Sequence, residues 1–179
     1  YTTGNTLSLH DALPISGRPP SDTRFLPAPA FSPTVYDDIL LPTDGSDGAR
    51  AVADHVGALA ENFDATVHVL AVADTRNRFE SPSSGLAPDV WEESENERAE
   101  AAVDDTVAVL PDGIDVERVV ESGVPHETII EYGKSADMDV IVMGTHGRTG
   151  LDHYLIGSVA ERVVRQSPVP VLTVRIDEQ

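Results

Sequence analysis

Short apolar runs alternate along the chain with longer segments in which apolar residues recur at helical spacing. One run, Val140–Met143, is apolar without alternation, which is typical of a strand covered on both faces of a parallel sheet. Similar runs predict further strands at Asp38–Leu41, Thr66–Val72, Asp115–Glu121 and Val169–Val174. The pattern therefore predicts five strands separated by helices.

The segments between these strands predict four helices. The first carries apolar residues at helical spacing, namely Ala49, Val52, Ala53, Val56, Leu59 and Ala60. The second presents on one face Ala99, Ala102, Val103, Thr106, Val107 and Leu110. The third begins at Pro125, which suits a first helical turn, and ends at Gly133. The fourth begins at Ser158 and is expected to turn Val159, Val163 and Val164 to one side. Residues 74–90 are polar and broken by prolines, so we expect a long loop there. This loop is expected to cover part of the ligand site that the residues after the fourth strand predict.

Strands that alternate with helices are typical of an α/β fold. The pattern predicts a three-layer α/β sandwich around a five-stranded parallel sheet with right-handed crossovers. Residues 34–179 carry this whole pattern and are expected to form one domain. Residues 1–33 are rich in proline and show no periodicity, so we expect a disordered extension. Its opening residues 1–16 lack the acidic bias of the rest, which is typical of a translated extension rather than native protein.

Three glycines and a serine follow the fourth predicted strand. They form the pattern G-x2-G-x9-G-S at Gly144, Gly147, Gly157 and Ser158. Glycine lets the backbone approach a ligand because it has no Cβ, and Ser158 with Glu161 has the spacing of a capping box. Each residue alone is as readily explained by a turn or a cap. Their combination at the start of a helix, whose unpaired N–H groups attract anions, predicts a phosphate site.

The turn after the first strand, Thr43-Asp44-Gly45-Ser46, tests rival motifs. A dinucleotide-binding turn requires G-x-G-x-x-G and a P-loop requires G-x4-G-K-[ST], and neither occurs here. A hydrolase nucleophile elbow needs glycine two residues before serine, where Asp44 stands. At the carboxyl end of a strand, Asp44 can reach a ribose or adenine. Both Asp44 and Ser46 are also ordinary N-cap residues.

These motifs resemble those of the universal stress protein family, whose nucleotide-binding members carry G-x2-G-x9-G-(S/T) in this position. The resemblance covers residues 35–175 and includes PTDGS at its start and PVPVLTV at its end. It implies a Rossmann-like sheet, similar to that of adenine nucleotide alpha hydrolases, with strand order 3-2-1-4-5. In that order the winding direction reverses between strands 1 and 4, so Asp44 and the Gly144 loop are expected to flank one crevice.

The resemblance also implies a ligand, its contacts and a partner. The expected cofactor is ATP with Mg²⁺, and the family implies a homodimer formed by strand 169–174, an exposed edge. Asp44 is expected to hold the nucleoside, and His146 and Arg148 are candidate phosphate donors. Val72 is a candidate wall of the adenine pocket, although it suits the core equally well. The expected contact residues are Pro42, Thr43, Asp44, Val72, Met143, Gly144, His146, Gly147, Arg148, Gly157, Ser158 and Val159.

The charge and composition of the chain limit the kinds of partner that it can bind. The chain carries 31 acidic against 12 basic residues, for a formal net charge of −19. Such a surface repels nucleic acid and anionic membranes and lacks the basic stripe that nucleic-acid recognition requires. We therefore expect neither a nucleic-acid nor a membrane partner. The chain has no cysteine and no apolar run long enough to span a bilayer, so we expect a cytoplasmic protein.

Catalysis is not predicted. The histidines lack metal-ligand spacing, and hydrolysis would need a positioned base and a clamp at the γ-phosphate, for which the sequence offers no convincing residues. We therefore expect at most weak ATP hydrolysis. The favoured interpretation is a dimeric, nucleotide-dependent sensor or adaptor in a stress response. The alternatives are an interaction scaffold of the same fold without nucleotide, and a slow ATPase or autophosphorylating enzyme.

The charge pattern also predicts a halophilic protein. Acidic residues replace lysine, of which Lys134 is the sole example, and multimolar salt screens the self-repulsion of such a surface. We expect the free energy of unfolding to rise between dilute buffer and multimolar KCl. Denaturant titrations followed by circular dichroism at both salt levels measure this difference. An ordinary acidic protein would show its full stability in dilute buffer.

Overall fold

The described part of the chain falls in one unit, Val35–Gln179. The structure, a computed structural model, describes residues 36–76, 88–145 and 157–175. The extension expected at residues 1–33 lies outside the described residues, and nothing in the structure tests it.

The strands form one parallel sheet in the order β3-β2-β1-β4-β5. They are β1 (Asp38–Thr43), β2 (Thr66–Asp74), β3 (Val116–Gly123), β4 (Val140–Gly144) and β5 (Val171–Val174). The helices are α1 (Asp47–Phe63), α2 (Pro88–Val107), α3 (Pro125–Ser135) and α4 (Ser158–Gln166). The predicted α/β fold and strand order are confirmed.

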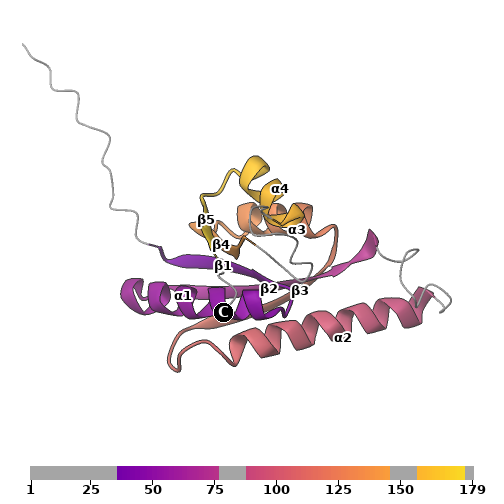
Figure 1. Cartoon of the computed structure of the whole chain (residues 1–179), viewed down its shortest axis with the longest axis horizontal. Coiled ribbons are helices and arrows are strands. Elements are labelled where there is room, and N and C mark those ends of the chain that lie inside the picture. The colour runs from indigo at the N-terminus through magenta and orange to yellow at the C-terminus, as the bar shows by residue number, and fades with distance from the viewer. Residues whose placement is uncertain (1–35, 77–87, 146–156, 176–179) are drawn as a thin grey trace, which may run out of the picture. The chain divides into compact units, whose positions relative to one another are not determined.

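Alternate residues of the central strands point to opposite faces of the sheet. In β1, Ile39 and Leu41 pack on one face and Leu40 on the other, and in β4 Val142 and Met143 divide in the same way. Helices α1 and α2 cover the first face, and α3 and α4 cover the second (Figure 1). Because both faces are covered, both sets of positions are apolar, which explains the unbroken runs in the sequence.

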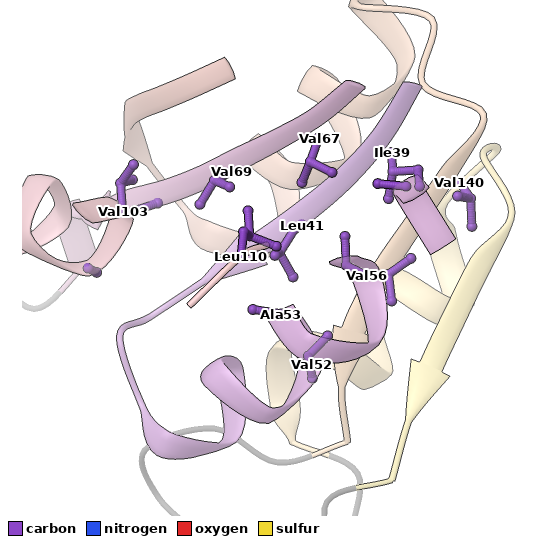
Figure 2. Packing of buried hydrophobic residues seen from close by; sticks show 14 of the residues in the cluster. Ile39, Leu41, Val52, Ala53, Val56, Val67, Val69, Val103, Leu110 and Val140 are labelled. Atoms are coloured by element: carbon purple, nitrogen blue, oxygen red, sulfur yellow. The ribbon is translucent and has the colours of Figure 1, made fainter. Parts of the chain in front are cut away.

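The larger core lies between the sheet and helices α1 and α2. In Figure 2, Val52 and Val56 of α1 lie opposite Ile39 and Leu41 of β1, and Val103 of α2 joins the same cluster. Val52, Val56, Ile39 and Leu41 are at most 1% exposed. Each such side chain contributes about 1.5–3 kcal/mol on burial.

The strands extend further toward their carboxyl ends than the sequence predicts. β1 continues through Thr43, and β2 continues past Val72 to Asp74. The extension follows from pairing, because Thr43 lies opposite Ala71 and Asp74 opposite Gly123 in regular parallel register. Pro42 and polar residues at these strand ends do not fit the apolar pattern of a buried strand, so the sequence does not predict them as strand. These same ends line the cavity of the candidate site described below.

Three further boundaries correct the prediction. Helix α2 begins at Pro88, inside the loop predicted for 74–90, because proline has the φ angle of a first helical turn and lacks the N–H that would go unpaired there. Helix α3 continues past Gly133 to Ser135. Strand β5 begins at Val171 rather than Val169, since Pro170 has no N–H to give to a strand ladder.

The predicted apolar side of helix α4 is narrower than expected. Val163 is fully buried, Val159 is half-buried and Val164 is 46% exposed. The helix is short and lies over the edge of the sheet beside β5, so only one stripe of its surface meets the core. The apolar character of Val164 therefore does not report burial.

A buried histidine joins three strands and a helix on the α3 face. His68 of β2 is 7% exposed, and its Nδ1 lies 2.9 Å from the hydroxyl of Tyr132 in α3. Its Nε2 lies 3.3 Å from Asp38 Oδ1 of β1, and its Nδ1 lies 3.5 Å from Glu117 Oε2 of β3. Burial, and next the carboxylate of Glu117, raises the pKa of the Tyr132 hydroxyl, because both oppose a phenolate.

We expect Tyr132→Phe to lower the free energy of unfolding by about 1 kcal/mol near neutral pH, the contribution of one hydrogen bond to His68. The raised pKa adds stability to the wild type below the unfolded-state pKa of about 10, and this is lost as the pH rises through the folded-state pKa. The difference between the two proteins should therefore narrow in alkali. Urea titrations of both at about pH 8 and pH 11 measure it, and a gap that stays constant or widens would contradict the assignment.

Candidate functional site

The turn after β1 is held to helix α2 by a chain of hydroxyl hydrogen bonds. The Thr106 hydroxyl donates to the Ala102 carbonyl at 2.8 Å, so the Thr43 hydroxyl donates to Thr106 Oγ1 at 2.7 Å. Thr43 Oγ1 then accepts from the N–H of Gly45 at 3.1 Å. The Thr43 side chain is therefore engaged within the protein, and its role is to position the turn.

The turn itself needs glycine at its closest approach to α2. Gly45 has a φ of +75°, and a Cβ there would lie 3.1 Å from the Cβ of Ala102. Asp44 Oδ1 accepts from the N–H of Ser46 at 3.0 Å, which forms an Asx turn. Ser46 Oγ accepts from the N–H of Ala49 at 3.2 Å and caps α1. Of the two N-cap candidates, Ser46 is the cap, and Asp44 lies at the end of β1.

Helix α4 begins beside the end of β4. Gly157 is its N-cap, and the Gly157 N–H donates to the carbonyl of Thr145 at 2.6 Å. The predicted capping box is wrong, because Ser158 is already the first helical residue and no side chain caps this end. Glu161 instead pairs with Arg165 at 2.7 Å. The helix begins at Ser158 as predicted, but its N-cap is Gly157, whose backbone N–H is held by Thr145.

This start leaves backbone donors directed out of the helix. The Gly157 carbonyl accepts the first bond, from the N–H of Glu161 at 2.9 Å. The N–H groups of Ser158, Val159 and Ala160 therefore have no acceptor within the helix. Together with the helix dipole, they make this end of α4 suitable for an anion.

A cavity of about 350 Å³ joins the two predicted stretches at the carboxyl ends of β1, β2 and β4. β1 pairs with β4 only at Ile39 and Leu40, so beyond this point the two strands are no longer hydrogen-bonded. His146, Gly147 and Arg148 lie outside the described residues. The predicted site residues that line the cavity are Pro42, Thr43, Asp44, Val72, Met143, Gly144, Gly157, Ser158 and Val159.

Sequence reasoning missed the walls that the helices and β2 contribute. These residues are Ser46, Ala49, Leu70, Ala71, Asp74, Glu95, Arg98, Ala99, Ala102, Pro125, Ile129 and Ala160. Ala99 and Ala102 lie on the face that the periodicity of the second helix predicts to be buried. The period alone does not distinguish a helix residue beside a cavity from one in the core, because both lie on the same face.

Charged side chains along the β2 and α2 side of the cavity are paired. The Asp74 carboxylate accepts from the Arg76 side chain at 2.9 and 2.7 Å and from the Arg76 N–H at 3.0 Å. Burial by itself would raise the pKa of Asp74, but these hydrogen bonds outweigh it and hold that pKa below its usual value. On α2, Arg98 Nη1 donates to Glu95 Oε1 at 3.0 Å. Of the described side chains that line the cavity, only Arg98 is cationic.

The described residues contain neither a cluster of metal ligands nor a membrane-spanning helix. No three His, Asp or Glu side chains in residues 36–76, 88–145 and 157–175 gather closely enough to hold a metal ion. Within the same ranges, no helix combines the length and apolar character needed to cross a membrane. The candidate site consists of the cavity, the N-terminus of α4 and the paired charges of β2 and α2.

A sequence profile of the Universal stress protein family matches residues 36–175, the range that holds every described element from β1 to β5. The chain belongs to the universal stress protein family. The resemblance indicated by the glycine motif and by the PTDGS turn is thereby confirmed.

This universal stress protein is similar to two relatives from Methanocaldococcus jannaschii. It is 38% identical over 146 residues to universal stress protein MJ0531, a match that covers 79% of this chain and 83% of the relative. It is 34% identical over 156 residues to universal stress protein MJ0577, covering 79% and 96% of the two chains. The solved structure of MJ0577 superposes with a TM-score of 0.62 over 81% of this chain and 99% of its own, at 33% identity.

A third relative has a nucleotide in its structure. It is a universal stress protein solved in complex with cAMP, 25% identical in sequence. It covers 79% of this chain and 98% of its own length, with a TM-score of 0.51.

Proposed function

We propose that this universal stress protein binds ATP with Mg²⁺ and acts in the cytoplasm as a dimeric, nucleotide-dependent sensor or adaptor in a stress response. The observation that carries the proposal is one cavity at which the α4 N-terminus, the Asp44 turn and Val72 of β2 meet. A relative solved with cAMP supports an adenine nucleotide as the ligand class.

The phosphates suit the α4 end of the cavity. The N–H groups of Ser158, Val159 and Ala160 are free of helical acceptors, and the dipole of α4 favours an anion by about 0.3–1 kcal/mol. In a chain with a net charge of −19, backbone donors hold an anion without a cluster of basic side chains. The Ser158 hydroxyl adds an oxygen at this end, and Mg²⁺ takes oxygen ligands, most of which the phosphates supply.

The nucleoside suits the β1 and β2 end. Asp44 brings a carboxylate to the end of β1, where it can accept from ribose hydroxyls. Leu70, Val72 and Ile129 offer apolar contact to the faces of a base. The cavity thus has a polar end and an apolar end in the order that a nucleotide requires.

A cavity-filling substitution tests the proposal without touching a predicted ligand contact. Ala99 lines the cavity and is 6% exposed, so Ala99→Leu places three further carbon atoms where the ligand would lie. We expect MgATP binding, measured by calorimetric titration in multimolar KCl, to weaken at least tenfold. The melting temperature should change little, because leucine and alanine are similar in helix propensity and the cavity offers room.

The matched control is Ala101→Leu, on the exposed face of the same helix. It makes the same chemical change outside the cavity, so its MgATP affinity should equal that of the wild type. Undiminished binding by a folded Ala99→Leu protein would contradict the proposed site. A wild type that binds no nucleotide would favour the alternative of an interaction scaffold of the same fold.

The proposed dimer uses the edge strand β5. This strand is last in the sheet order, so one side of it has no partner strand among the described residues, and Leu172 is 38% exposed on it. Light scattering in multimolar KCl should give twice the chain mass of 19.1 kDa. Leu172→Arg should give the monomer mass, because charge on an edge strand opposes pairing.

Val120→Arg provides the control for the dimer test. Val120 is 36% exposed on β3, at the opposite edge of the sheet, and its substitution should leave the dimer mass unchanged. A monomeric wild type would refute the proposed assembly. Loss of the dimer in the Val120→Arg protein would place the interface at the β3 edge and contradict the proposed β5 interface.

A further inference from the structure

A fully buried hydroxyl on α2 lies behind the turn that carries Asp44. Thr106 is 0% exposed and does not line the cavity, yet its Oγ1 lies 2.7 Å from Oγ1 of Thr43 at the end of β1. The two residues are 63 positions apart in the chain. In sequence Thr106 lies between Val103 and Leu110, two side chains of the larger core. A hydroxyl in this position is costly to bury unless it is hydrogen-bonded.

Packing alone does not explain a threonine at position 106. Valine has nearly the same shape, a similar helix propensity and no hydroxyl to bury. The Thr106 hydroxyl uses its hydrogen on the Ala102 carbonyl at 2.8 Å, so toward Thr43 its oxygen can only accept. The Thr43 hydroxyl therefore donates to Thr106, and Thr43 Oγ1 accepts from the N–H of Gly45 at 3.1 Å. The acceptor on which this chain of hydrogen bonds depends is Thr106.

Further contacts connect this chain of hydrogen bonds to the Asp44 carboxylate. Gly45 follows Asp44 directly, and it lies close to α2, because a Cβ there would be 3.1 Å from the Cβ of Ala102. On the other side, Asp44 Oδ1 accepts from the N–H of Ser46 at 3.0 Å. The carboxylate thus belongs to a turn that meets α2 at Ala102 and, through Thr43, at Thr106, which lies one helical turn further along.

We infer that Thr106 is a positioning residue of the nucleotide site and acts through Asp44, an inference that rests on the proposed function of this cavity. Without an acceptor on α2, the Thr43 hydroxyl is a donor with no partner in a side chain that is only 8% exposed. Another rotamer can direct this hydroxyl into the cavity, which Thr43 lines, but it moves Oγ1 away from the Gly45 N–H. The turn then loses its anchor, and the Asp44 carboxylate loses its fixed direction.

The test is the MgATP affinity of Thr106→Val, measured by calorimetric titration on the full chain in multimolar KCl. We expect binding to weaken about tenfold, roughly the effect of one hydrogen bond, although Thr106 does not line the cavity. The melting temperature should stay close to that of the wild type, because the lost hydrogen bond is offset by removal of a polar group from the core. Thr106→Ser keeps the hydroxyl and should bind MgATP as the wild type does.

Val103→Ala is the control for a purely structural effect. Val103 is 2% exposed on the same helix and does not line the cavity, so its truncation loosens the packing of α2 and leaves the hydroxyl chain in place. We expect a clear fall in melting temperature, because a buried side chain is shortened, and an unchanged MgATP affinity. If Thr106→Val also lowers the melting temperature and leaves the affinity unchanged, Thr106 is a core residue only and the inference is overturned.

A double-mutant cycle with Asp44→Asn tests whether Thr106 acts through Asp44. The asparagine amide can still accept from the Ser46 N–H, so the variant keeps this turn contact and removes the charge. Once Asp44→Asn has weakened MgATP binding, Thr106→Val should weaken it no further. Losses that add in full, or an Asp44→Asn protein with undiminished affinity, would overturn the inference and leave nucleotide binding intact.

The remaining outcomes are also decisive. A wild type that binds no nucleotide overturns the proposed function itself. If Thr106→Val fails to fold, Thr106→Ala removes the same hydroxyl, introduces a residue of higher helix propensity and takes its place in both comparisons.

Discussion

The register of β1 determines where the cavity lies in this protein. β1 is hydrogen-bonded to β2 along Asp38–Thr43, but it pairs with β4 only at Ile39 and Leu40. The chain then leaves β1 into α1 on one face of the sheet and reaches α4 after β4 on the other. Because the two connections diverge, the strand ends between them are covered by neither helix layer, and the cavity occupies this gap. The remaining residues of the site line this cavity.

Small residues lie where the turn after β1 meets α2 at the cavity. Gly45 adopts a φ of +75° and passes close to Ala102, while the Thr43 and Thr106 hydroxyls join the turn to α2. A side chain at Gly45 would push α2 away from the turn, and a larger residue at Ala99 would fill the space. The small residues of the turn therefore let α2 pack close to it. This packing places Glu95 and Arg98 of the same helix at the cavity.

Two acidic side chains of the cavity are paired, although the chain as a whole has a net charge of −19. Asp74 is held by Arg76, and Glu95 is held by Arg98. These pairs reduce the local repulsion that an anionic ligand would otherwise meet, while the N–H groups at the start of α4 provide attraction. A strongly acidic protein and a phosphate-bearing ligand are thus compatible.

The sequence by itself determined the fold, its strand order through family resemblance, and three residues that line the cavity, Asp44, Gly144 and Gly157. These features are local, since a glycine between a strand and a helix and an unbroken apolar run report the backbone and burial around them. The cap of α4 was decided by a contact distant in sequence, because the Gly157 N–H donates to the Thr145 carbonyl and Gly157, not a side chain of the helix, is the N-cap. The tertiary structure likewise decided that α2 begins at Pro88 and that Asp74, Glu95 and Arg98 line the cavity. Helical periodicity shows which face of α2 turns inward, but only the packing of α2 beside the turn after β1 shows that the inward face meets open space.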